Sequence, residues 1–277
     1  MQEFSIVKVF FFNFGLDFNH SEMLKKTVMI TGATAGIGEA TAKLLAENGY
    51  RLILTGRRKE RLDRLQAALQ KEFQAEVWTL VFDVRNLRQV ENAIDSLPED
   101  WKKIDILINN AGLAAGLSSV QEGEIGDWEQ MIDTNLKGLL YVTRKISPQM
   151  AERHSGHIIN ISSIAGKETY PMGNVYCATK HAVQSLTKGM RLDMLKHGIK
   201  VSSVAPGAVN TEFSTVRFKG DSQRAEKVYE GFMPLLARDI AETILFVITR
   251  PPHVNIDDVL VMPAAQASSR DFDRKLS

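Results

Sequence analysis

Short apolar segments alternate with helical segments along nearly the whole chain, beginning at Thr27. The apolar segments expected to form strands are Thr27–Thr31, Leu52–Leu54, Val77–Phe82, Ile104–Ile108, His157–Ile161, Val201–Ala205 and Val259–Met262. The segments expected to form the clearest helices between them are Gly36–Asn48, Trp128–Met150, Asn174–Lys196 and Asp239–Thr249. Strands that are apolar throughout and alternate with helices are typical of a parallel sheet covered on both faces. The alternation predicts an α/β fold with one doubly wound domain and about seven parallel strands.

Length, charge and cysteine content narrow the class of protein. A chain of 277 residues suits one domain with a large core. Its formal net charge of +1 argues against an extended surface for nucleic acid or anionic membrane. No apolar stretch reaches the roughly 18 residues of a transmembrane helix, and the single cysteine, Cys177, excludes an internal disulfide. We expect a cytoplasmic protein with no nucleic-acid partner, no membrane partner and no metal site.

The first 22 residues differ from the rest of the chain. Six of the 13 phenylalanines lie between Phe4 and Phe18, and the segment lacks both the charged start of a signal peptide and the polar face of an interfacial anchor. We expect residues 1–22 to be a poorly ordered extension, or Met23 to be the natural start. An anchoring or targeting role is the alternative. The folded domain is then expected over residues 23–277.

A glycine-rich segment follows the first expected strand, where the chain reads Thr31-Gly-Ala-Thr-Ala-Gly-Ile-Gly38. Glycines at this point allow a tight turn and close approach of the backbone to a pyrophosphate, and the helix that begins there offers unpaired N–H groups. The spacing is Gly-x-x-x-Gly-x-Gly rather than the more common Gly-x-Gly-x-x-Gly. The residues expected to contact the dinucleotide here are Gly32, Thr34, Gly36, Ile37 and Gly38.

The end of the second strand indicates which dinucleotide binds. An enzyme that uses NAD usually has an acidic residue there for the ribose 2′-hydroxyl, but this chain has Arg57 and Arg58. Two guanidinium groups can bind a 2′-phosphate, so we expect NADP; the alternative is that both arginines only begin a solvated helix. Asp83 and Val84, after the third strand, are expected near the adenine, although Asp83 is equally suited to capping the next helix.

Tyr176 and Lys180 lie four residues apart on an expected helix and therefore share one face. A nearby ammonium group favours the phenolate and brings a tyrosine closer to the pKa of a useful acid or base. Ser163, just beyond a strand, is placed to hydrogen-bond a reacting oxygen. A solvated helical pair is the alternative for the first two. Cys177 and His181 form a second pair at the same spacing, which leaves a cysteine hydrolase as a remote alternative.

Taken together, these segments resemble the short-chain dehydrogenase/reductase family, whose fold is a single Rossmann-type domain. The motifs that carry the resemblance are the glycine segment, Asn109-Asn-Ala-Gly112, Asn135, Ser163, Tyr176-x-x-x-Lys180 and Pro206-Gly207. The resemblance implies that Tyr176 is the general acid/base, that Ser163 orients the substrate, that Lys180 lowers the tyrosine pKa and holds the nicotinamide ribose, and that Asn135 supports a relay water. The further residues that it places at the cofactor are Asn109, Ala111, Gly112, Pro206, Gly207, Val209 and Thr211.

Three stretches carry a narrower resemblance to the NADP-dependent 3-hydroxy acid dehydrogenases. They are Tyr170-Pro-x-Gly-Asn-Val-Tyr176, Thr211-Glu-Phe-Ser-x-Val-Arg-Phe-Lys-Gly220 and the end segment Val254-Asn-Ile256…Met262-Pro263. This implies a small 3-hydroxy or 3-oxo acid substrate and a homotetramer. The segment of about residues 208–232 is expected to be a lid over the substrate. In it, Arg217 offers a bidentate partner for a carboxylate and Lys219 can assist; the alternative is surface charge on a mobile loop. The alternative functions are reduction of a bulkier neutral carbonyl compound by NADPH, and NADPH binding without catalysis.

Overall fold

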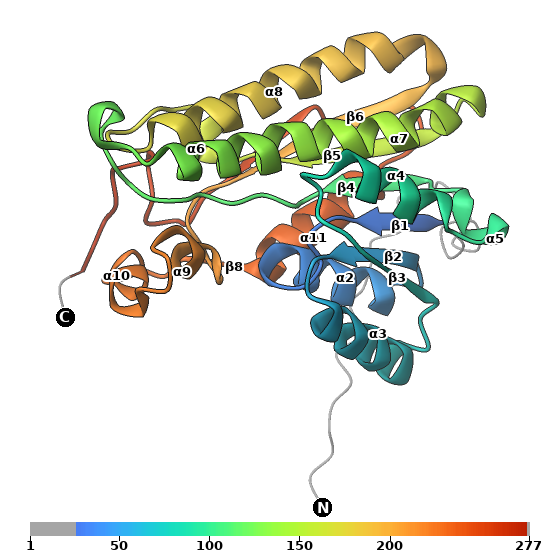
Figure 1. The fold of residues 1–277 in the computed structure, drawn as a ribbon, viewed down its shortest axis with the longest axis horizontal. Coiled ribbons are helices and arrows are strands. Elements are labelled where there is room, and N and C mark those ends of the chain that lie inside the picture. Colours follow the sequence, from blue (N-terminus) through green and yellow to red (C-terminus); the bar gives the residue numbers. More distant parts are fainter. Residues whose placement is uncertain (1–25, 276–277) are drawn as a thin grey trace, which may run out of the picture.

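Seven parallel strands form one sheet in the order β3-β2-β1-β4-β5-β6-β9 in the computed structural model, which describes residues 26–275 (Figure 1). The strands are β1 (Thr27–Ile30), β2 (Arg51–Gly56), β3 (Val77–Val81), β4 (Ile106–Asn109), β5 (Gly156–Ile161), β6 (Ile199–Pro206) and β9 (Asp258–Val261). The prediction of one doubly wound domain with about seven strands is confirmed. The expectations for residues 1–22 and for Met23 as the start lie outside the described residues.

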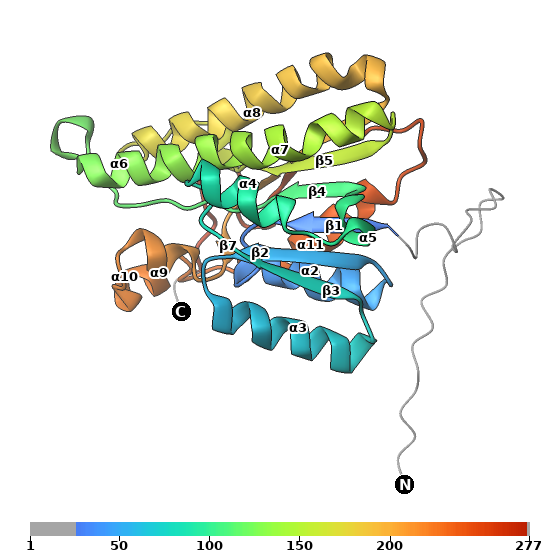
Figure 2. The ribbon, with the colours of Figure 1, turned by 45° about the vertical axis from the view of Figure 1, so that its right-hand side comes forward.

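Helices cover both faces of this sheet. The main helices are α2 (Gly36–Glu47), α3 (Lys59–Phe73), α4 (Leu87–Asp95), α6 (Ile125–Ile132), α7 (Leu139–Glu152), α8 (Asn174–Met194) and α11 (Ala237–Ile248). Shorter turns of helix are α5 (Glu99–Lys102), η1 (Val120–Glu122), η3 (Ile164–Gly166) and η4 (Leu195–His197). Helices α7 and α8 lie on one side of the sheet, and α2 and α3 lie on the other (Figure 2).

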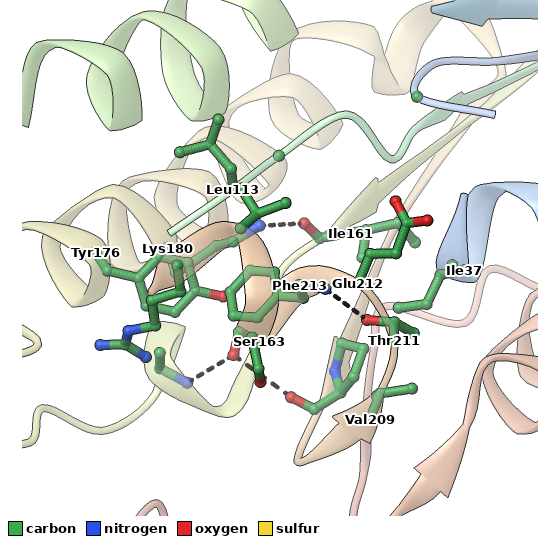
Figure 3. Close-up of a pocket in the computed structure, with 18 of the residues that line it drawn as sticks. Ile37, Leu113, Ile161, Ser163, Tyr176, Lys180, Val209, Thr211, Glu212 and Phe213 are labelled. Atoms are coloured by element: carbon green, nitrogen blue, oxygen red, sulfur yellow. Dashed lines mark hydrogen bonds between the residues drawn. The ribbon is translucent and has the colours of Figure 1, made fainter. Parts of the chain in front are cut away.

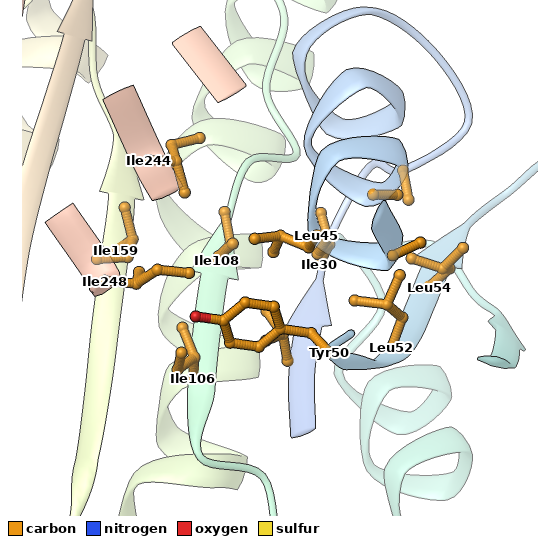
Figure 4. Packing of buried hydrophobic residues seen from close by; sticks show 14 of the residues in the cluster. Ile30, Leu45, Tyr50, Leu52, Leu54, Ile106, Ile108, Ile159, Ile244 and Ile248 are labelled. Carbon is orange, nitrogen blue, oxygen red and sulfur yellow. The ribbon is translucent and has the colours of Figure 1, made fainter. Parts of the chain in front are cut away.

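The strands are apolar throughout because each one serves two cores. Leu52 and Leu54 of β2 pack into the cluster that includes Leu45 of α2 and Ile244 of α11 (Figure 4). Ile53, between them, packs into the cluster on the opposite face, with the residues of α4, α7 and α8. Successive side chains of a strand point to opposite faces, so both faces of a doubly covered sheet must be apolar.

The order of the strands reverses at β1, which pairs with β2 on one side and with β4 on the other. In open parallel sheets, ligands bind outside the carboxyl ends of the strands at such a point. The glycine-rich segment follows β1 here, and Asn110 follows β4. The fold therefore positions a ligand site where the sequence predicts the phosphate loop.

One expected helix departs from regular geometry. The segment predicted as Trp128–Met150 consists of α6, a π-helical turn η2 (Asp133–Gly138) and α7. A π-helical turn inserts an extra residue and is frequent at functional sites. Asn135 lies in this turn.

The chain after β6 contains structure that the sequence did not indicate. Two short strands, β7 (Val209–Asn210) and β8 (Leu235–Leu236), pair in parallel and enclose α9 (Phe213–Arg217) and α10 (Ser222–Lys227). We call residues 208–232 the lid segment and residues 263–275 the tail; the tail folds back on itself through a bridge between Gln266 and Phe272. Among residues 26–275, no helix has the length and apolarity needed to cross a membrane.

Candidate active site

A cavity of about 580 Å³ opens at the carboxyl edge of the sheet (Figure 3). The sequence-predicted residues that line it are Gly32, Thr34, Gly36, Ile37, Arg57, Arg58, Asp83, Val84, Ala111, Gly112, Ser163, Tyr176, Lys180, Pro206, Gly207, Val209, Thr211 and Arg217. Four predicted residues do not line it: Gly38, Asn109, Asn135 and Lys219. The fold thus gathers segments from along the whole domain around one cavity.

The glycine-rich segment fits a dinucleotide phosphate. Gly32 has φ +68°, and a Cβ on Gly38 would lie 2.4 Å from the carbonyl oxygen of Gly32, so α2 begins directly against the turn. Gly38 therefore contributes close packing of the helix. Ala35 occupies the N-cap of α2 and provides no capping side chain. The N–H groups at this helix end are accordingly available to an anion.

Asn110, which sequence reasoning did not single out, stabilises the same turn. Its amide Nδ2 donates to the carbonyl oxygens of Thr31 (2.9 Å) and Gly32 (3.1 Å). The neighbouring Asn109 instead points into the core, where its Nδ2 donates to Asn160 Oδ1 and Thr143 Oγ1, both at 2.9 Å. Within the Asn-Asn-Ala-Gly motif, the second asparagine lines the cavity and the first lies beneath it.

The two arginines after β2 lie at the expected adenosine end of the cavity. Arg58 donates from Nε and Nη2 to Thr34 Oγ1, at 3.2 and 2.9 Å, and Arg57 lies 3.8 Å from Asp83. Burial acts to raise the pKa of Asp83, but hydrogen bonds from Arg85 outweigh it and the pKa is lowered. Asp83 does not cap the next helix, since the Asn86 side chain accepts from Gln89 N at the start of α4. The arrangement suits a 2′-phosphate facing two guanidinium groups.

Tyr176 and Ser163 meet at the centre of the cavity. Tyr176 is 7% exposed and Ser163 is 9% exposed. The Ser163 hydroxyl accepts from Ala165 N at 3.1 Å and lies 3.4 Å from the carbonyl oxygen of Pro206, which fixes its direction. Burial raises the pKa of Tyr176, whereas the nearby Ser163 hydroxyl and the charge of Arg217 act to lower it. The phenol is therefore protonated at neutral pH and able to donate.

Lys180 is buried beside the tyrosine. Its Nζ donates to the carbonyl oxygen of Ile161 at 2.9 Å and lies 6.0 Å from the Tyr176 ring centroid. Burial lowers the pKa of Lys180 to about 8. The influences that lower the tyrosine pKa here come from Ser163 and Arg217, so the pKa-lowering role of Lys180 stays a prediction.

Asn135 supports the wall of the cavity from behind. Its carboxamide accepts from Leu113 N at 2.9 Å and donates to Leu113 O at 2.8 Å and to Thr179 Oγ1 at 3.1 Å. A Cβ on Gly112 would lie 3.3 Å from Asn135 Oδ1 and 3.4 Å from Lys180 Nζ. A side chain at this position would crowd Asn135 and Lys180, so a glycine suits it. The relay-water role of Asn135 is not tested by these contacts.

The lid segment places Arg217 in the cavity and Lys219 outside it. Arg217 donates from Nη1 to the Tyr170 hydroxyl at 3.0 Å and from Nε to Gly116 O at 3.2 Å. Its Nη2 is buried and has no partner among the described residues. Lys219 is 61% exposed and pairs with Asp127 at 3.0 Å, because the chain turns away after α9. Of the two cations, only Arg217 lines the cavity, so its role at the substrate stays a prediction.

Sequence reasoning missed several residues of the substrate end. Tyr170 holds Arg217, and the ring of Phe213 lies 5.6 Å from that of Tyr176. The tail residues that line the cavity are Gln266, Ser269, Phe272 and Arg274. Tyr170 and Phe213 belong to the stretches that carry the narrower resemblance, which was a usable signal, whereas nothing in the sequence connects the tail with the site.

The geometry of Cys177 and His181 does not support the cysteine hydrolase alternative. Cys177 is buried, burial raises the pKa of its thiol, and His181 directs Nδ1 to the Cys177 backbone oxygen rather than to sulfur. A catalytic cysteine requires an accessible thiolate. Within residues 26–275, no group of three or more His, Cys, Asp or Glu side chains is arranged to hold a metal ion.

Comparison with known proteins agrees with this geometry. The family model described as short chain dehydrogenase matches residues 26–221. The NADP-dependent 3-hydroxy acid dehydrogenase YdfG of Salmonella typhi is 48% identical over 241 residues, which cover 87% of this chain and 96% of the relative. Sulfoacetaldehyde reductase 2 of Chromohalobacter salexigens is 44% identical over 243 residues, covering 87% and 96% of the two chains.

Solved structures give the same result. The closed form of a serine dehydrogenase complexed with NADP⁺ superimposes with a TM-score of 0.84 and 44% identity, covering 90% of this chain and 100% of that one. The serine dehydrogenase of Escherichia coli gives a TM-score of 0.75 and 40% identity, with 87% and 99% of the chains covered. With a matching family model, close relatives and the tyrosine, serine and lysine gathered around one cavity, the chain belongs to the short-chain dehydrogenase family.

Proposed function

We propose that the protein is an NADP-dependent dehydrogenase that acts at the 3-position of a small 3-hydroxy acid, or of the corresponding 3-oxo acid in the reverse direction. The relatives named as 3-hydroxy acid and serine dehydrogenases support this proposal. Serine, allo-threonine and 3-hydroxypropionate represent the expected substrate class. The observation that carries the choice of an acid is Arg217, whose Nη2 is buried without a partner among the described residues.

The residues that hold the coenzyme follow from the fit of the cavity. The N–H groups at the start of α2 would hold the pyrophosphate, and Arg57 and Arg58 would hold the 2′-phosphate. Lys180 would hold the nicotinamide ribose. When bound, the coenzyme supplies the nicotinamide carbon that exchanges hydride with the substrate carbon. The apolar side chains of Leu113 and Ile161 line the cavity and would limit access of water to that carbon.

Tyr176 transfers the proton, and Ser163 positions the substrate oxygen. In reduction, the Tyr176 hydroxyl donates its proton to the carbonyl oxygen of the substrate, while the Ser163 hydroxyl hydrogen-bonds the same oxygen and holds it in place. In oxidation, the phenolate takes the proton back. Because burial raises the pKa of Tyr176, the resting enzyme carries the proton needed for reduction. The positive charge of Arg217 stabilises the phenolate left after donation.

Arg217 determines which substrates are bound productively. A charge-assisted, bidentate hydrogen bond from a buried guanidinium orients a carboxylate and positions the 3-carbon below Tyr176. A sulfonate presents the same charge, which makes sulfoacetaldehyde a second candidate, in line with the named activity of one relative. A bulky neutral ketone would leave Nη2 of Arg217 buried without a partner, which is unfavourable.

The experiment measures a panel of substrates in both directions, with NADP⁺ for the alcohols and NADPH for the carbonyl compounds. NADP⁺ reduction is measured with D- and L-serine, allo-threonine, 3-hydroxypropionate and 3-hydroxyisobutyrate, and NADPH oxidation with sulfoacetaldehyde and with hydrophobic ketones. We expect kcat/KM to be highest for a 3-hydroxy acid. Higher values for neutral ketones would overturn the proposal in favour of a general carbonyl reductase. Binding of NADPH with no turnover of any compound would leave only a coenzyme-binding role.

We further propose that the enzyme works in the cytoplasm as a homotetramer. Support for association comes from Leu192 and Leu195 near the end of α8, which are 76% and 72% exposed in the single chain, and from Leu260 on the edge strand β9, which is 44% exposed. A contiguous exposed apolar patch often marks a surface covered by another chain, and these leucines are candidates for such a patch. Light scattering coupled to gel filtration measures the mass; a monomer would contradict the proposal.

A further inference from the structure

A carboxylate of the lid segment contacts Arg58, one of the two arginines expected to bind the 2′-phosphate. Glu212 directly follows Thr211 and extends across the edge of the cavity (Figure 3). Its Oε2 accepts from Arg58 Nη1 at 3.1 Å, and its Oε1 accepts from Arg61 Nη1 at 2.7 Å. Both arginines come from the start of α3, more than 150 residues earlier in the chain.

The remaining donors of Arg58 face the phosphate loop. Its Nε and Nη2 contact Thr34 Oγ1, so the guanidinium bridges Thr34 on one edge and Glu212 on the other. Hydrogen bonds from Arg61 and then Arg58 lower the pKa of Glu212, which keeps this carboxylate ionised at neutral pH. A stable negative charge therefore lies at the subsite where an incoming phosphate dianion must bind.

Two anions cannot share one guanidinium edge without repulsion, because like charges a few ångströms apart disfavour one another even near a protein surface. We propose that Glu212 is an internal anion that competes with the 2′-phosphate of the coenzyme for Arg58, and that phosphate binding breaks this contact and loosens the start of the lid segment, which then keeps only the Arg61 contact to α3. The lid segment then becomes free to rearrange over a substrate only after a 2′-phosphorylated coenzyme has bound. This inference rests on the proposed use of NADP.

Calorimetric binding to the free protein tests the competition. The probes are adenosine 2′,5′-bisphosphate and 5′-AMP, which differ only in the 2′-phosphate. Glu212→Gln removes the competing charge and keeps the size of the side chain, so it should strengthen binding of the bisphosphate and leave 5′-AMP unchanged. We expect a three- to tenfold effect, because Arg58 and Glu212 are 43% and 47% exposed and partly exposed ion pairs contribute modestly.

Glu226→Gln is the matched control, since Glu226 is an exposed residue of α10 in the same lid segment. It removes the same charge away from Arg58 and should change neither binding constant. Unchanged or weaker bisphosphate binding by Glu212→Gln, or an equal gain in Glu226→Gln, overturns the competition. Equal binding of both probes by the wild type instead overturns the proposed NADP preference, and the inference with it.

Hydrogen exchange of residues 211–220 tests the loosening. In the wild type, the bisphosphate should accelerate amide exchange in this stretch relative to 5′-AMP. In Glu212→Gln, exchange should already be fast in the free protein and respond equally to both probes. Slower or unchanged exchange in the wild type with the bisphosphate would show that Glu212 closes over the phosphate, which contradicts loosening.

Discussion

The guanidinium carbon of Arg217 lies 5.7 Å from the ring centroid of Tyr176 and 5.5 Å from that of Tyr170. One cation from the lid segment is thus held between the expected proton donor and a second, supporting tyrosine. Its charge acts to lower the pKa of Tyr176, and its Nη2 is buried without a partner among the described residues. We therefore expect Arg217 to connect recognition of the substrate with transfer of the proton.

Replacement of Arg217 should lower kcat/KM for acids much more than for their methyl esters. A charge-assisted hydrogen bond contributes about 1.5–3 kcal/mol, so Arg217→Ala should lower kcat/KM for a 3-hydroxy acid by roughly ten- to a hundredfold. The methyl ester should lose far less, and Arg217→Lys should recover only part of the loss because an ammonium lacks the planar fork. The measurement is the acid-to-ester ratio of kcat/KM in each variant.

Lys219→Ala is the control for this ratio. Lys219 is a cation two residues further along, but it pairs with Asp127 outside the cavity. Its removal should leave the acid-to-ester ratio at the wild-type value. If Arg217→Ala also leaves the ratio unchanged, Arg217 does not bind the carboxylate.

Tyr176→Phe should abolish most turnover and preserve coenzyme binding. The substitution removes only the phenolic oxygen from a buried ring, so the cavity keeps its shape. Loss of a general acid/base lowers kcat by about a hundredfold or more. Steady-state kinetics give kcat, and fluorescence titration gives the Kd for NADPH. A variant with near-normal kcat would refute the assignment of Tyr176.

Replacement of Arg57 and Arg58 by alanine should remove most of the coenzyme preference. We expect the wild type to favour NADP⁺ over NAD⁺ by at least about tenfold, or ~1.4 kcal/mol. The double variant loses both guanidinium groups of the phosphate subsite, so kcat/KM should fall for NADP⁺ and change little for NAD⁺. Equal kcat/KM for both coenzymes in the wild type would contradict the reading of these arginines.

Lys180→Met should stabilise the coenzyme-free protein at neutral pH. The pKa of Lys180 falls from 10.5 in the unfolded chain to about 8 in the folded one, so burying the charge costs about 3 kcal/mol below pH 8. Loss of the hydrogen bond to Ile161 O offsets about 1 kcal/mol of the gain. Between pH 8 and 10.5 the folded protein releases the proton first and the cost disappears.

Urea unfolding at pH 7 and pH 10 measures this effect. The gain in the free energy of unfolding should be about 2 kcal/mol at pH 7 and should vanish at the higher pH. Lys188→Met, an exposed lysine of the same helix, is the control and should show no such pH dependence. A destabilised Lys180→Met protein at pH 7 would mean that the charge is well solvated.

His157→Gln should make the protein less sensitive to acid. His157 is 4% exposed in β5, and burial, together with the charges of Lys200 and Lys26, lowers its pKa to about 3. Between pH 6.5 and 3 the unfolded chain binds a proton that the folded protein excludes, so stability falls as the pH falls. From pH 6.5 to 4.5 this loss amounts to about 2–3 kcal/mol.

Glutamine keeps a polar group towards Ser202 Oγ, which lies 2.9 Å from Nε2, but does not titrate. Chemical unfolding at pH 7 and pH 4.5 should therefore show a smaller difference in the variant than in the wild type. His253→Gln, at an exposed position, should behave as the wild type does. An equal loss in His157→Gln would locate the acid sensitivity elsewhere.

The sheet was predictable from the sequence because each strand must be apolar on both faces. Leu52 and Leu54 face one core and Ile53 faces the other, so no position in this stretch is polar. Such an apolar run can be recognised from the neighbouring residues alone. The π-helical turn around Asn135 was not predictable in this way, since its sequence keeps ordinary helical periodicity. Strands β7 and β8 contain two residues each, too few to show any period.

The candidate site was likewise predictable only in part. The phosphate loop, Ser163, Tyr176 and Lys180 were predicted because they sit at fixed points relative to strands and helices. The pairing of Lys219 with Asp127, and of Arg58 with Glu212, joins residues that are far apart in the chain. Such ion pairs depend on how the lid segment folds back, which local sequence does not specify. The same holds for the tail.

The cavity is lined by segments from along the whole domain, but its two ends come from different parts of the chain. Residues up to Asp83 build the nucleotide end, whereas the lid segment and the tail build the substrate wall. A chimaera that takes everything beyond Pro206 from a relative with another substrate should acquire that substrate and retain the original coenzyme. The ion pair between Arg58 and Glu212 joins the nucleotide end to the lid segment. A chimaera should therefore take Arg58 and Glu212 from the same parent.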